Sequence, residues 1–450
     1  MRKNLYTIFL VFCSQMVFAQ TTIIRNSEIA KMISEISSDS LEHHVRVLAS
    51  FNSRHTLSID EEEGMPAAQQ YVLSKFNHFA KQSGGRMTAE IEKFVIPGDD
   101  RRIPTDSPAA NVMATLKGIN PADDRIFIIS AHMDSRNKDV MDEKGPSPGA
   151  NDNGSGTAAV IELARIMASH QFSATILFVA FTGEEQGLKG ATYLADKAKN
   201  EGWNIGAVLN NDIIGNSSSS ETLIKDNLMM RVFSETIPAA ETEQEATIRK
   251  YINADNDSKS RQLARYIKEH GERYVDQFEV KLIYRADRFL RGGDQTPFAK
   301  NGMTAIRISE MNENFLHQHE NVRMEDGVQY GDLPDFMDYE YLRKVTAVNL
   351  ASLASLADSP DQPLEVKIDV RNLSNQTTLL WKAPKFGKAK GYFVLMRETS
   401  SSMWERKFWT TDTSLTLPYS KDNYFFAVQS VAESGAEGIP VLPTPLFKLN

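Results

Sequence analysis

The chain has 450 residues, a net charge of −9 at pH 7 and a single cysteine. The acidic balance argues against nucleic-acid binding, which usually requires a basic face, and we expect the charge to form a solvated acidic surface. Beyond the N-terminus, no segment is long and apolar enough to cross a membrane. The length suggests two or three domains.

The N-terminus has the layout of a secretory signal peptide. Arg2 and Lys3 precede a short apolar run, and Ala19 ends a Val-Phe-Ala sequence. We therefore expect residues 1–19 to be removed and the protein to be exported, to the periplasm or the medium. In an alternative interpretation Cys13 is the acylated residue of a lipoprotein, although no small residue precedes it. Otherwise the mature protein has no cysteine and depends on its core for stability.

Between residues 20 and 358, apolar runs alternate with segments of helical periodicity. This alternation predicts an α/β domain with a mixed, largely parallel central sheet flanked by helices. In such sheets, ligands bind beyond the carboxyl ends of the strands. The predicted strands are residues 112–116, 125–130, 175–181, 205–210, 280–284 and 304–308, and the predicted helices are residues 156–170, 188–198 and 339–356.

Residues 215–278 interrupt this alternation. The segment is polar and contains four serines in a row, Ser217 to Ser220. Long excursions of this kind are often lids or walls of a functional site, and a surface insertion without a role is the equal alternative.

After Pro360 the helical periodicity ends. Short alternating runs separated by turn residues follow, so residues 364–450 predict a small antiparallel β-sandwich. Trp381 in an early run and an aromatic late run make this segment resemble a fibronectin type III module. Residues 358–362 are the expected linker. Because linkers carry few contacts, we expect a chain that ends near Asp358 to fold and keep its function.

Acidic and histidine residues stand in five short blocks of the larger domain. The first four blocks follow apolar runs that are predicted strands or lie just beyond them. Together the blocks offer two histidines and three carboxylates as metal ligands and one carboxylate for proton transfer, which fits two zinc ions sharing a bridging water. The sequence therefore predicts a metal-dependent hydrolase. The residues are His132 and Asp134, Asp152, Glu184 and Glu185, Asp212, and His317 and His319.

The spacing within the blocks suggests particular roles. Two residues after His132, Asp134 can hold the far ring nitrogen of the histidine. The adjacent carboxylates of Glu184 and Glu185 repel one another unless cations neutralise them, so one can bind metal while the other moves a proton. A surface His–Asp pair or a helix N-cap at Asp152 would explain single blocks, but not the ordered set.

In their order, these blocks resemble those of the secreted aminopeptidases with two co-catalytic zinc ions. Relatives of that family include glutaminyl cyclases and glutamate carboxypeptidases. The resemblance covers residues 39–358. It implies His132 and Asp212 on one zinc ion, Glu185 and a late histidine on the other, Asp152 bridging both ions, and Glu184 as general base.

The late histidine block departs from the family pattern. There the ligand histidine is followed four positions later by an aspartate, and Asn321 stands in that place if His317 is the ligand. His317 is therefore the preferred ligand and His319 the reserve. The resemblance also implies a cis peptide bond between Asp152 and Asn153.

The resemblance further implies a zinc-dependent aminopeptidase that acts on peptides with a free N-terminus. Glu184 and Asp134 are the expected catalytic residues. A glutaminyl cyclase on the same fold is one alternative. A catalytically inactive binding protein is another, although none of the expected ligands is missing.

Overall fold

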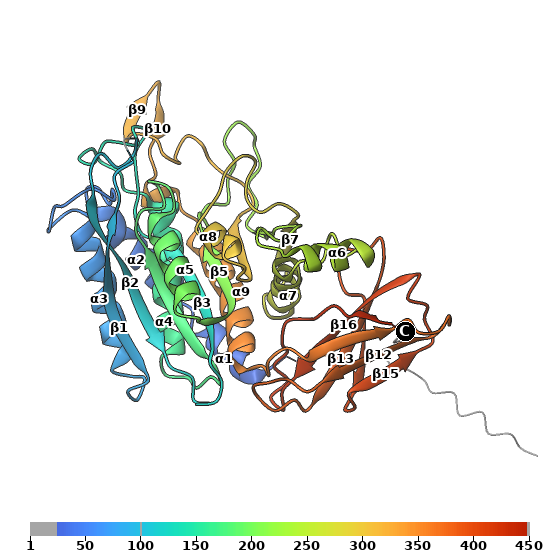
Figure 1. Cartoon of the computed structure of the whole chain (residues 1–450). Coiled ribbons are helices and arrows are strands. Elements are labelled where there is room, and N and C mark those ends of the chain that lie inside the picture. The colour runs from blue at the N-terminus through green and yellow to red at the C-terminus, as the bar shows by residue number, and fades with distance from the viewer. Residues whose placement is uncertain (1–24, 100, 448–450) are drawn as a thin grey trace, which may run out of the picture.

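Figure 1 shows a computed structural model in which a large α/β body is joined to a smaller body of strands at its C-terminal end. The structure describes residues 25–99 and 101–447, so the predicted signal peptide lies outside the described residues. Among the helices it describes, none combines the length and the apolar character that a membrane span requires.

The large body is built on an eight-stranded sheet with the order β1-β2-β4-β3-β5-β8-β6-β7. Strands β4, β3, β5 and β8 run parallel to one another, whereas β1 and β2 are antiparallel additions at one edge. The prediction of a mixed, largely parallel sheet is confirmed. The strands are β1 Met87–Ile96, β2 Ser107–Leu116, β3 Arg125–His132, β4 Thr175–Phe181, β5 Asn204–Asn211, β6 Met229–Phe233, β7 Glu279–Ile283 and β8 Ala305–Glu310.

Successive residues of a strand point to opposite faces of the sheet. Both faces of this sheet therefore carry apolar side chains, and helices cover both. Ile129 of β3 and Phe178 of β4 face the larger apolar core. Ile128 and Val179, their neighbours in sequence, face a smaller core under α5 and α8. The helices are α1 Ser27–Ser34, α2 Ser38–Ser50, α3 Met65–Ala80, α4 Gly156–Met167, α5 Lys189–Asn200, α6 Glu243–Tyr251, α7 Lys259–Tyr274, α8 Gln295–Lys300 and α9 Tyr339–Asp358.

The polar segment 215–278 is part of this framework. Its strand β6 pairs with β7 and β8 at the sheet edge. Its helix α7 packs on α9 through buried side chains such as Leu263 and Ile267. Part of the segment is therefore structural, which neither expectation included, and a lid or wall formed by the rest of it stays a prediction. The charged residues of α7 obscure an apolar stripe that only the packing reveals.

The smaller body contains two sheets packed face to face around Leu379, Trp381, Val394 and Val428. One sheet has the order β15-β12-β11-β17 and the other β14-β13-β16. The predicted sandwich is thus present, while its membership of the fibronectin type III class stays a prediction. The strands are β11 Leu364–Asp369, β12 Thr377–Lys382, β13 Gly391–Glu398, β14 Arg406–Thr410, β15 Ser414–Leu417, β16 Tyr424–Val431 and β17 Thr444–Leu446.

The two bodies share a charged interface along α7. Arg273 of α7 donates to Glu437 of the sandwich at 2.8 Å, and Tyr266 donates to the carbonyl of the same residue at 2.8 Å. Near the other end of α7, Asp257 accepts from Arg397 of β13 at 2.7 Å. The junction therefore carries many more contacts than the linker expected from the sequence.

Candidate metal centre

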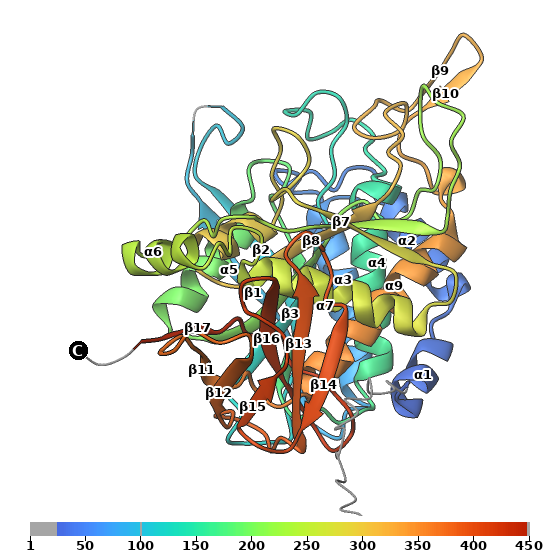
Figure 2. The same ribbon diagram turned by 90° about the vertical axis from the view of Figure 1, so that its right-hand side faces the viewer.

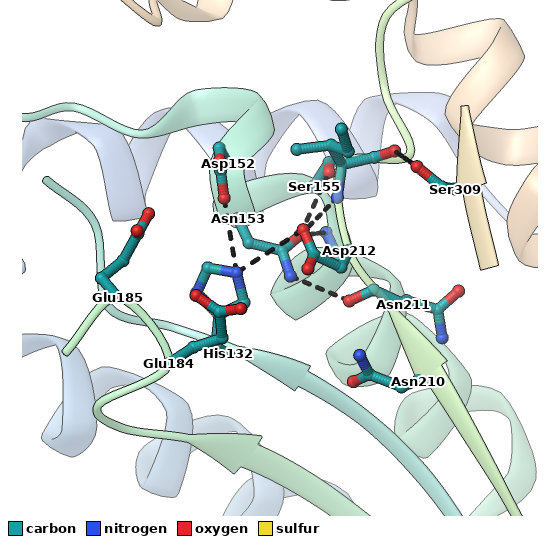
Figure 3. Close-up of polar contacts among 12 residues, drawn as sticks. His132, Asp152, Asn153, Ser155, Glu184, Glu185, Asn210, Asn211, Asp212 and Ser309 are labelled. Carbon is teal, nitrogen blue, oxygen red and sulfur yellow. Dashed lines mark hydrogen bonds and ion pairs between the residues drawn. The ribbon is translucent and has the colours of Figure 1, made fainter. Parts of the chain in front are cut away.

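The strand order brings three of the five sequence blocks together. Strands β4, β3 and β5 are neighbours, and their carboxyl ends lead to Glu184 and Glu185, to His132 and to Asp212 respectively. Figure 3 shows these side chains pointing toward one another and toward Asp152. This placement is the one expected for ligand-binding residues of a parallel sheet.

Asp152 lies in a turn of π-helical hydrogen bonding, Ala150–Ser155, that leads into α4. The peptide bond between Asp152 and Asn153 is cis, as the resemblance implied. The carboxylate of Asp332 accepts from the backbone N–H groups of Asn151 and Asp152 at 2.9 and 2.7 Å. The turn is therefore fixed from outside by an acid that is distant in sequence.

Two groups of potential metal ligands share the carboxylate of Asp152. One of its oxygens lies 3.3 Å from Nε2 of His132, which also faces Asp212 at 3.7 Å. The other oxygen lies 2.8 Å from Nε2 of His319, which faces Glu185 at 2.8 Å. Glu184 adjoins the first group, within 4.8 Å of His132 and Asp212. Two sets of nitrogen and oxygen donors thus meet at one carboxylate.

These donors fit zinc. Nε2 of His132 is buried and makes no hydrogen bond within the described residues, although carboxylate oxygens of Asp152 and Asp212 face it at 3.3 and 3.7 Å. A buried ring nitrogen left unpaired among acids is the arrangement that a bound cation would complete. Imidazole nitrogen and carboxylate oxygen are both common zinc ligands.

The structure corrects the position of the late histidine. The ring of His317 stacks on Phe336 with 3.8 Å between the ring centroids, and His317 belongs to neither ligand group of the described residues. His319 occupies the predicted place instead. The two histidines are separated by one residue, and His319 has a positive φ of 57°, so their side chains do not share the common direction expected of an extended strand.

Asp134 lies behind His132 rather than facing the reacting groups. Its carboxylate accepts from the backbone N–H groups of Glu184 and Glu185 at 3.3 and 3.0 Å and from Thr56. It lies 3.6 Å from Nδ1 of His132. This is the position behind His132 that the spacing predicted, from which Asp134 can orient His132 and the glutamate loop. A catalytic role for Asp134 stays a prediction.

Two arginines that the sequence blocks did not include bind the outer carboxylates. Arg307 of β8 lies 2.9 Å from one oxygen of Asp212. Arg136 lies 2.9 Å from one oxygen of Glu185 and 2.6 Å from Nδ1 of His319. Neither arginine stands in a recognisable motif, so no sequence signal points to them.

The charges of the centre act strongly on one another. Burial raises the pKa of Glu184 well above its ordinary value, and the neighbouring Glu185 and Asp212 add to this effect while His132 opposes it. Burial opposes protonation of His319, but Glu185 and Asp152 outweigh it and raise its pKa to about 10. The carboxylates therefore favour a cation at the histidines, whether proton or metal ion.

The fold and this donor set define a zinc-dependent hydrolase. Residues 111–326 match peptidase family M28. The chain is 41% identical to a probable zinc metalloprotease of Leptosphaeria maculans, across 93% of this chain and 97% of that protein. It is 40% identical to a probable zinc metalloprotease of Pyricularia oryzae, across 93% and 85%. The chain belongs to peptidase family M28 and is a zinc peptidase.

Solved structures share the fold. The LapA aminopeptidase of Legionella pneumophila superimposes with a TM-score of 0.53 at 19% identity, over 80% of each chain. An aminopeptidase from Aneurinibacillus sp. strain AM-1 does so with a TM-score of 0.50 at 13% identity, over 72% of this chain and 95% of that one. At this level of identity the likeness is one of fold.

Proposed function

We propose that the protein is an aminopeptidase that uses two zinc ions to remove N-terminal residues from peptides. The observation that carries this proposal is Asp152, whose two oxygens each face a different histidine. A carboxylate shared in this way suits a pair of ions a few ångströms apart. The solved structures of similar fold that are named aminopeptidases support the choice of reaction.

In this proposal the ligands divide between two positions. His132, Asp152 and Asp212 would hold one ion, and Asp152, Glu185 and His319 would hold the other. When bound, zinc supplies Lewis acidity, which lowers the pKa of water and polarises a carbonyl group. The guanidinium groups of Arg136 and Arg307 each occupy one oxygen of Glu185 and Asp212 and leave the other oxygen free for a ligand bond.

Glu184 is the proposed general base. Its side chain lies beside His132 and Asp212, and its carboxylate accepts no hydrogen bond within the described residues. Its raised pKa suits a group that accepts a proton from the attacking water and then delivers it to the nitrogen of the leaving amine.

Substitution of the two adjacent glutamates tests these roles. Glu184→Gln should keep both zinc ions and lower kcat about 10²–10⁴-fold, the usual effect of losing a general base. Glu185→Gln is the matched variant and should lower the zinc content measured by atomic emission. Equal zinc loss in both variants would contradict the assignment.

A pair of reporter substrates tests the proposed specificity. We expect zinc-loaded enzyme to hydrolyse aminoacyl-anilides with a free amino group and to leave the N-acetylated anilides intact. Hydrolysis of both substrates at similar rates would contradict the restriction to N-terminal residues. Formation of pyroglutamate from a peptide with an N-terminal glutamine, without hydrolysis of the anilides, would favour a glutaminyl cyclase.

We also propose that the protein is exported after removal of residues 1–19. The basic start and the apolar run that follows support this. N-terminal sequencing of the mature protein should begin at Gln20, and retention of Met1 would contradict the proposal.

A further inference from the structure

A large cavity of the described residues lies away from the metal centre. It has a volume of about 1060 Å³ and opens between the segment that joins α6 to α7 and one end of the C-terminal sandwich. None of the proposed metal ligands lines it. Figures 1 and 2 show α6 and α7 lying above the sandwich, on the side where the two bodies meet. Cavities of this size at the junction of two bodies are frequent ligand sites.

Aromatic rings from both bodies form the walls. Tyr251 at the end of α6 is 69% exposed and Phe447 of the sandwich is 56% exposed, and their rings meet edge to face at 6.0 Å. Tyr284, Tyr424 and Phe425 continue this surface. Large rings left in solvent around a concavity are typical of a binding surface.

Beneath these walls, the chain buries more positive than negative charge. Asp257 accepts from Arg265 at 2.5 Å and from Arg397 at 2.7 Å, and these three residues line the cavity. Arg261 stands next to them with its guanidinium 3.4 Å from the ring centre of Tyr284. Arg261 donates only to neutral groups of Ser234 and Thr236. Of the arginines that line the cavity, Arg265 and Arg397 thus share the single carboxylate of Asp257.

This imbalance is costly because a buried cation needs a counter-charge. Nε of Arg397, which lines the cavity, is buried without a hydrogen-bond partner among the described residues. Burial lowers the pKa of Arg261 to about 10, which leaves it cationic at neutral pH. Lys421 and Asp422, which also line the cavity, cancel one another. An anionic group in the cavity would complete the charge balance.

We propose that this cavity binds a peptide through a carboxylate, with apolar side chains of the peptide packed against the aromatic walls. The cavity is far larger than a small inorganic anion needs. Side chains at its edge, Asn253, Asn256 and Ser400, make no hydrogen bond within the described residues and can bond to peptide groups. The carboxylate comes from the C-terminus of the peptide or from an acidic side chain.

Calorimetry with acetylated peptides tests the proposal independently of the metal centre, because a blocked amine is not a substrate of the proposed aminopeptidase. The probes for the full-length, zinc-loaded enzyme are Ac-Gly-Ser-Leu-Phe acid, its C-terminal amide, and the amide of Ac-Gly-Glu-Leu-Phe. We expect the acid to bind at least about tenfold more tightly than the first amide, the effect of a charge-assisted hydrogen bond. Tight binding of the glutamate amide would identify an acidic side chain as the source of the carboxylate.

Three variants locate the site. Tyr251→Ala removes an exposed ring and should weaken binding of the acid about tenfold or more, without changing hydrolysis of a small aminoacyl reporter. Arg397→Met should abolish the preference for acid over amide, and its melting temperature shows whether it folds. Leu373→Ala, which removes a fully exposed apolar side chain of the sandwich outside the cavity, is the matched control.

Several outcomes would overturn the proposal. These are equal affinity for the acid and both amides, no binding of any peptide at millimolar concentration, and equal weakening by Leu373→Ala and Tyr251→Ala. Inorganic phosphate that binds as tightly as the peptide acid and displaces it would also overturn it, because the site would then recognise a bare anion.

Discussion

At the scale of single residues, the two oxygens of each proposed ligand carboxylate face different neighbours. Asp152 divides its oxygens between His132 and His319. Asp212 and Glu185 each give one oxygen to a histidine and the other to an arginine. In Asp212 and Glu185, the oxygen that faces the histidine is therefore the one that can bind a metal ion. This favours coordination through a single oxygen of each carboxylate.

The choice between the two late histidines is directly testable. His319→Ala should lose about one zinc ion per chain, because a site with few protein ligands binds weakly when one is removed. His317→Ala should keep both ions, since this ring only stacks on Phe336. Zinc content of the two purified variants is the measurement. Loss of zinc from the His317 variant alone would restore the assignment made from the sequence.

At the scale of secondary structure, a buried chain of amides connects α9 to the metal centre. Asn349 of α9 donates to the side chain of Asn211 at 2.8 Å, and the carbonyl of Asn211 accepts from Asn153 at 2.8 Å. Asn211 precedes Asp212, and Asn153 follows Asp152. The helix therefore fixes the separation of two proposed ligands.

We expect Asn349→Leu to weaken zinc binding about 10–100-fold, the usual cost of losing an outer-shell partner. Ser352→Ala is the matched control, because Ser352 is equally buried on α9 but donates only to the carbonyl of Val348. Competition with a chelator measures both affinities. If the two variants lose zinc affinity equally, the amide chain does not position the ligands.

Helix α7 carries a buried histidine that makes the stability of the protein depend on pH. Burial, with Arg273 nearby, lowers the pKa of His270 to about 4. In the unfolded chain the imidazole of His270 binds a proton near pH 6.5. In the folded chain it binds a proton only near pH 4. The stability contribution of this residue is complete above pH 6.5 and is lost as the pH falls toward 4, by about 3 kcal/mol in all.

His270→Phe should remove this part of the acid sensitivity, because the ring still packs on Tyr266 and carries no proton. Urea unfolding at pH 7 and pH 5 gives the two free energies. His78 is exposed on α3. His78→Phe should leave the difference in the free energy of unfolding between pH 7 and pH 5 as it is in the unsubstituted protein. An unaltered pH dependence in the His270 variant would contradict the argument.

At the scale of the whole molecule, the sandwich is anchored to the peptidase body by buried ion pairs. Removing it would leave Arg273 without Glu437 and Asp257 without Arg397. The truncation would also expose apolar surface to water, including the part of the main core that Ile439 of the sandwich joins. We therefore expect a chain that ends at Asp358 to be markedly less stable than the full chain, contrary to the expectation from the sequence.

Thermal unfolding of the shortened and full chains measures this difference. The control is a full chain in which the exposed ion pair between Lys390 and Glu433 of the sandwich is removed by substitution. Removing an exposed pair changes the free energy of unfolding by at most about 1 kcal/mol. A shortened chain with the melting temperature of the full chain would show that the two bodies are independent.

The sequence by itself determined the class of fold. It also identified the central strands, the blocks of acidic and histidine residues that follow them, and most of the proposed metal ligands. Strands buried on both faces leave long apolar runs, and the residues that follow them meet at one sheet edge. His132, Asp152, Glu184, Glu185 and Asp212 lie together for this local reason.

Only the tertiary structure decided between His317 and His319, placed Arg136 and Arg307 on the ligands, and joined α7 to the sandwich. These features depend on contacts between segments far apart in the chain or on the course of an irregular loop. Periodicity and motif spacing depend on local geometry, so they do not predict which side chain from a distant segment makes a given contact.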